Sequence, residues 1–163
     1  MGTPSIIIPI PTGTVSGFYA SQNDLTTIYG TTNVAQWSQL DGSPTPGAIQ
    51  PNTGKILACL QMADNIINGQ FQNGPFTVPL PANPGGLSGA SSQVYDTNRW
   101  AVALAARALY MARMQRDAVT EKRLDDECDA VMFEMVQVKN GARQAYPLFQ
   151  RRWPTASGAY SLG

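Results

Sequence analysis

Three short stretches of this chain carry residue types that could support catalysis or ligand binding. The Gly-Leu-Ser-Gly run at 86–89 is close to the turn that exposes a nucleophilic serine, but its spacing differs. A serine nucleophile also needs a general base, usually histidine, and the 163 residues include none. Gly54-Lys55 lacks the upstream glycine and the downstream Ser or Thr of a phosphate-binding loop. The sequence therefore indicates a protein that is not an enzyme and needs no cofactor.

Asp125, Asp126 and Asp129 form the third stretch, the one nearest to a metal-binding arrangement. On a helix, Asp126 and Asp129 would be near neighbours on one face. Lys122 and Arg123 would lie equally close, and cations beside carboxylates are typical of a solvated charged face. The sequence therefore predicts no metal site.

Asp64 and Arg107 are charged residues that fall within apolar stripes. At about 100° per residue, Asp64 lies about 40° from Leu60 on its predicted helix, and Arg107 lies in the stripe of Trp100. A buried charge without a partner costs several kcal/mol. We therefore expect a buried ion pair between Asp64 and Arg107, or contact of each with other polar groups at an interface.

Helices must position all these residues, and the two longest are predicted in the second half of the chain. One spans residues 97–115 and the other 121–139, with Asp96 and Thr120 as expected N-caps. Asn-Gly at 140–141 ends the second helix, because glycine adopts the left-handed conformation readily. The short connection makes an antiparallel hairpin the default arrangement.

The second long helix is predicted to have two distinct faces. Its apolar stripe comprises Leu124, Cys128, Val131, Met135 and Val138. Phe133 lies opposite that stripe, between Lys122 and Asp126, which makes it a candidate for a subunit interface. The first long helix is apolar on two sides, which is typical of a helix at the centre of a domain or an assembly.

Earlier helices complete the predicted domain. A short helix begins at Ser21, which forms a capping box with Asp24, and another spans residues 32–40. Asn52 caps a longer helix that runs to about Phe71. These elements predict an all-α fold, a small helical bundle.

The predicted domain spans residues 18–141, with a Gly/Pro-rich loop at 72–95 and extended segments on both sides. The N-terminal arm is residues 1–17 and the C-terminal tail is residues 142–163. Prolines exclude helix from the arm, and its apolar residues have no core of their own. We expect them to pack on a neighbouring subunit or partner, and the candidates are Ile6, Ile7 and Ile8.

Composition argues against several partner classes. The formal net charge is zero, which gives no electrostatic case for binding nucleic acid or an acidic membrane. No stretch approaches the ~20 apolar residues of a membrane span, and the N-terminus lacks the pattern of a signal peptide. Cys59 and Cys128 are expected to be buried free thiols in a reducing compartment.

Four stretches, in this order, resemble the head–tail connector (adaptor) proteins of tailed phages. They are Tyr-Ala-Ser, Asp-Leu and Tyr-Gly within 19–30, Ala-Asp and Ile-Asn-Gly-Gln-Phe within 63–71, Phe-Thr-Val-Pro-Leu at 76–80, and Trp-Ala-Val-Ala-Leu-Ala-Ala-Arg at 100–107. The family more often has an acidic residue at the position of Asn68. The chain also departs from the family in its long N-terminal arm, its Gly-rich loop at 84–92 and its longer tail.

The resemblance implies a structural protein of the virion neck, assembled in the host cytoplasm. Such proteins form rings, typically of twelve copies, below the portal vertex. The ring extends the DNA channel without sequence-specific binding and joins the head to the next neck or tail protein. Carried onto this chain, the resemblance implies portal contacts at Tyr146, Leu148, Phe149, Arg151, Arg152 and Trp153. The loop at 84–92 becomes a candidate tail-side contact.

Two other functions remain open from the sequence. The first is another neck protein, such as a stopper or tail terminator, although those often contain β-barrels. The second is a helical DNA-binding regulator, which needs a compact basic recognition helix. The basic residues of the first long helix are instead spread around its circumference: Arg99, Arg107, Arg113 and Arg116.

Overall fold

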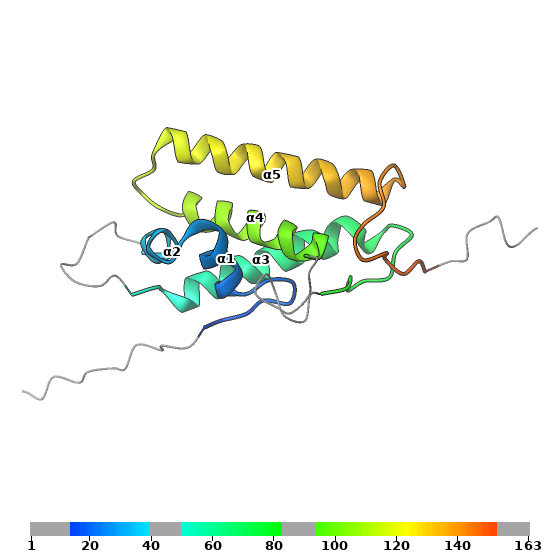
Figure 1. The fold of residues 1–163 in the computed structure, drawn as a ribbon, viewed down its shortest axis with the longest axis horizontal. Helices are drawn as coiled ribbons and strands as arrows, with labels where there is room; N and C mark the ends of the chain where they lie inside the picture. Colours follow the sequence, from blue (N-terminus) through cyan, green and yellow to red (C-terminus); the bar gives the residue numbers. More distant parts are fainter. Residues whose placement is uncertain (1–13, 40–49, 83–93, 153–163) are drawn as a thin grey trace, which may run out of the picture.

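The computed structural model describes residues 14–39, 50–82 and 94–152, which form a bundle of five helices (Figure 1). In chain order these are α1 (Gln22–Tyr29), α2 (Thr31–Ser38), α3 (Thr53–Gln72), α4 (Asp96–Met111) and α5 (Ala118–Lys139). Beyond them, the described ranges contain two isolated bridges and no strand. The all-α prediction is therefore confirmed for this part of the chain.

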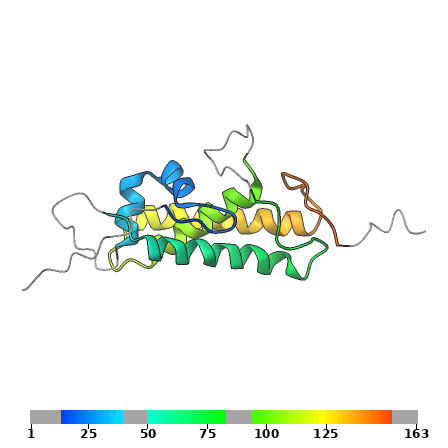
Figure 2. The same cartoon turned by 90° about the horizontal axis from the view of Figure 1, so that it is seen from below.

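The central helix is α4, which lies between α3 and α5 (Figure 1). Twelve of its 16 residues are buried, in agreement with the two-sided apolar pattern of the sequence. Its alanines allow the neighbouring helices to approach closely, while Trp100 and Leu109 fill the larger spaces. The short helices α1 and α2 lie beside one end of the long ones, where Trp37 of α2 contacts Tyr110 of α4 (Figure 2).

Helix α5 presents its apolar stripe to the rest of the bundle, as predicted. The stripe is fully buried and consists of Leu124, Cys128, Val131, Met135 and Val138. Near the start of α5, Arg107 Nε lies 2.6 Å from Asp125 Oδ1. Further along, the indole N–H of Trp100 donates to Glu134 over 3.0 Å. Residues later in α5 thus meet residues earlier in α4.

Two of the predicted helix caps are confirmed. The Ser21 hydroxyl accepts from Asp24 N at 3.3 Å while the Asp24 carboxylate accepts from Ser21 N at 2.7 Å, which is the reciprocal capping box. Asn52 Oδ1 accepts from Lys55 N at 3.1 Å at the start of α3. Local side-chain spacing was sufficient for both predictions.

The caps predicted for the two long helices are wrong. Helix α5 is capped by Asp117, whose carboxylate accepts from Thr120 N at 2.9 Å, so the helix begins a turn earlier than expected. Asp96 lies inside α4, and Tyr95 is the N-cap. The Asp96 carboxylate instead accepts from Tyr146 N at 3.0 Å, a partner that lies far away in sequence. Helix α4 also ends at Met111, four residues before the predicted end at 115.

Candidate docking site

The chain leaves α5 through a glycine and turns back towards α3. Gly141 has φ 76°, in the left-handed region that glycine occupies without strain, as the Asn-Gly signal predicts. Beyond the turn, Thr77 N donates to Gln150 O at 2.8 Å, and Arg152 N donates to Pro75 O at 2.7 Å. Residues 142–152 are therefore fastened to the segment that follows α3.

Phe149 anchors this returning segment in the core. Its ring meets those of Phe71 and Phe76 edge to face, with centroids 5.6 and 5.7 Å apart, and it also contacts Trp100. Edge-to-face packing of buried rings contributes about 0.5–1.5 kcal/mol per pair beyond the burial itself. Only 7% of Phe149 is exposed, so this residue belongs to the core and is removed from the candidate portal contacts.

Two acids and two arginines hold the segment to α4 and α5. Arg143 Nη1 lies 2.9 Å from Glu134, and Arg99 pairs with both Glu134 and Asp96. Burial opposes ionisation of Glu134, but hydrogen bonds from Arg99 and Trp100 outweigh it and lower the pKa of this carboxyl below its usual value. The four charged groups balance one another, so this cluster is a structural clamp.

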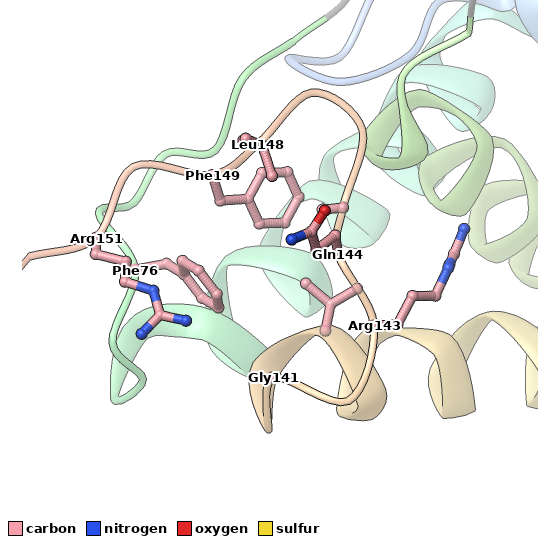
Figure 3. Close-up of a pocket in the computed structure, with 9 residues that line it drawn as sticks. Phe76, Gly141, Arg143, Gln144, Leu148, Phe149 and Arg151 are labelled. Carbon is pink, nitrogen blue, oxygen red and sulfur yellow. The ribbon is translucent and has the colours of Figure 1, made fainter. Parts of the chain in front are cut away.

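A groove opens between the returning segment and the end of α5 (Figure 3). Its volume is about 340 Å³, and we name it the corner groove. The side chains that line it are mostly apolar, with an arginine on either side: Phe76, Val138, Ala145, Leu148, Phe149, Arg143 and Arg151. Leu148 is 72% exposed, so the groove has an unprotected apolar residue on its wall.

The remaining portal-contact candidates fall into two groups. Tyr146, Leu148, Arg151 and Arg152 are exposed at this end of the bundle, as a contact surface requires. Trp153 lies outside the described residues, as does the loop at 84–92. The structure thus brings four of the six candidates to one end of the bundle.

A second apolar surface lies on the outer face of α5. Phe133 is 62% exposed and Val136, one turn later, is exposed beside it. This agrees with the predicted position of Phe133 opposite the buried stripe. The other candidates for a subunit interface, Ile6, Ile7 and Ile8, lie outside the described residues.

A third surface, at the turn between α4 and α5, was not found from the sequence. Met114 is 86% exposed there, and Val119 is also exposed. The helix predicted over residues 97–115 would include Met114. Since α4 ends at Met111, Met114 lies beyond the helix and projects into solvent.

Asp64 and Arg107 do not pair with each other, so the predicted buried ion pair is wrong. Asp64 accepts hydrogen bonds from the main-chain N–H groups of Phe18 and Tyr19, at 2.7 and 3.1 Å. Arg107 is only half-buried and pairs with Asp125 on α5. The expectation that each charge needs a partner was correct. The partners are main-chain groups before α1 for Asp64 and a residue of α5 for Arg107.

The described residues contain no group of three Cys, Asp or Glu side chains that could hold a metal ion. Cys59 and Cys128 are buried free thiols, and burial raises the pKa of each. Tyr19 is buried as well, and burial raises its pKa to about 12, while its hydroxyl accepts from Leu80 N at 2.9 Å.

No family model, no curated protein and no solved structure matches the chain. Among the helices of the described ranges, none combines the length and the apolar character needed to cross a membrane.

Proposed function

We propose that this protein is a structural component of the neck of a tailed phage, a head–tail adaptor. In this proposal, copies of the chain form a ring below the portal that extends the DNA channel. The α4–α5 hairpin, taken as antiparallel, forms the subunit surface. The exposed corner around Leu148 meets the portal protein.

The observation that carries the proposal is the exposure of Phe133 on the outer face of α5. Large apolar side chains that gather on a helix opposite its buried stripe are typical of surfaces covered by other proteins. Val136 extends this surface along the helix, and Leu148 and Met114 place further exposed apolar groups at the two ends of the bundle. A chain with apolar groups on three sides fits a position surrounded by neighbours.

The mass of the protein in solution tests this proposal. The chain would be measured alone and after mixing with portal rings of the phage that encodes it. We expect many copies to join each portal ring, with a stoichiometry that saturates. A chain that ignores portal rings but retards a DNA fragment at moderate salt contradicts the adaptor function and favours a DNA-binding regulator.

A further inference from the structure

Three cations lie at this corner of the bundle, one at the end of α5 and two on the returning segment. A Cβ built on Gly74 would lie 3.6 Å from Lys139 Cε, so the lysine at the end of α5 runs alongside this glycine. The main-chain N–H of Arg152 donates a hydrogen bond to Pro75 O. Arg151 places its guanidinium carbon 5.8 Å from the centre of the Phe76 ring. We name Lys139, Arg151 and Arg152 the basic corner.

None of these cations has a carboxylate within ion-pair distance among the described residues. Six other cations in the same ranges are paired with acids: Arg99, Arg107, Arg116, Lys122, Arg123 and Arg143. The acids of this end of the bundle, Glu134 and Asp96, are already shared between Arg99 and Arg143. The chain as a whole is neutral, so the basic corner is a local positive excess.

The groove beside the cations selects among anionic partners. Its walls include Val138, Leu148 and Phe149, which offer contacts to an apolar side chain. A nucleic-acid backbone presents phosphates and sugars to such a surface, and three cations give it little affinity. A polypeptide can place carboxylates on the arginines and an apolar side chain in the groove at the same time.

We propose that the basic corner and the corner groove dock an acidic polypeptide segment that inserts one apolar side chain into the groove. The carboxylates pair with Arg151 and Arg152, and the apolar side chain packs against Leu148. The identity of the partner as a portal protein rests on the proposed function, but the chemistry of the docked segment does not. Figure 3 shows the position of Arg151 beside the groove.

A labelled peptide of glutamates around a single phenylalanine tests the site by fluorescence anisotropy. Arg152→Glu is the main variant, because its side chain forms no ion pair or hydrogen bond with the other described residues, and Arg151→Glu and Leu148→Ala are the others. Arg113→Glu is the matched control, since Arg113 also lacks an acidic partner in the described ranges but lies just beyond the C-terminal end of α4, far from the corner groove. We expect Arg151→Glu and Arg152→Glu each to weaken binding by about tenfold while Arg113→Glu leaves it unchanged, and added salt to weaken binding in the wild type.

Several outcomes would overturn the site. One is that Arg152→Glu and Arg113→Glu bind the peptide equally well. Another is that the wild type binds a peptide with lysines in place of the glutamates equally well. A third is that the corner variants lose DNA binding or self-association while they keep peptide binding. Portal rings separate this inference from the proposed function. Peptide binding without portal binding keeps the site and contradicts the adaptor function. If the Arg151→Glu, Arg152→Glu double variant still binds portal rings, the adaptor function is kept and the docking site is contradicted.

Discussion

Asp64 of α3 accepts a hydrogen bond of 2.7 Å from the main-chain N–H of Phe18, and a second from Tyr19. The carboxylate lies where the segment before α1 crosses α3, and Asp64 is only 8% exposed. A carboxylate that satisfies two amide donors replaces the water that these groups lose on burial. This contact explains how a charged residue is accommodated in the apolar stripe of α3.

Replacing Asp64 by alanine should therefore destabilise the fold. The change leaves the N–H groups of Phe18 and Tyr19 without their acceptor, and we expect a loss of about 2–4 kcal/mol in the free energy of unfolding. Urea denaturation followed by circular dichroism measures this loss. Asp126→Ala, on the exposed face of α5, serves as the control and should change stability by less than about 0.5 kcal/mol. Equal effects of the two variants would contradict the role given to Asp64.

Phe149 and Leu148 provide a matched pair of neighbouring residues with opposite environments. Phe149→Ala opens a cavity in the aromatic cluster with Phe71 and Trp100, and it should cost about 3–5 kcal/mol of unfolding free energy. Leu148→Ala removes a mostly exposed side chain and should change that free energy by less than about 0.5 kcal/mol. Thermal unfolding of both variants checks the difference. A mild effect of Phe149→Ala would show that residues 142–152 do not contribute to the core.

The local elements of this fold could be predicted from the sequence, because they depend on spacing along the chain. The stripe of α5, the capping box at Ser21 and the Asn52 cap each need residues three or four apart. The partners of Asp64 and the burial of Phe149 depend on segments distant in sequence. No periodic pattern marks Phe149, since it lies in an extended segment between Leu148 and Gln150.

The candidate site shows the same division. The family resemblance implies portal contacts within residues 146–153, and the structure leaves four of the six candidates exposed. The sequence could not show that Lys139 joins Arg151 and Arg152, because the turn at Gly141 brings them together only in three dimensions. Met114 was predicted to be helical, but α4 ends at Met111 and leaves it in the turn before α5.

Glu134 should make the stability of the protein depend on pH in the acidic range. Because Arg99 and its neighbours lower the pKa of Glu134 in the folded state, its contribution is fully present above the usual pKa and is lost as the pH falls through the folded value. Glu134→Gln should cost about 1–3 kcal/mol at neutral pH. The difference between wild type and variant should shrink as the medium becomes acidic. Urea midpoints measured across the pH range test this, and a difference that stays constant with pH contradicts it.

Phe133 separates assembly from folding. The side chain is 62% exposed and lies opposite the buried stripe of α5, so Phe133→Ala should change the free energy of unfolding by less than about 0.5 kcal/mol. If neighbouring copies cover this face in a ring, the same change removes a buried aromatic contact, and such residues often contribute 2 kcal/mol or more, ~30-fold in affinity, to an interface.

Sedimentation of saturated portal complexes should then show fewer copies per ring for Phe133→Ala. Met62→Ala is the control because Met62 is a partly exposed apolar residue on α3, away from this face. A full complement of Phe133→Ala copies would exclude the outer face of α5 as the subunit surface, even if the chain still docks on the portal.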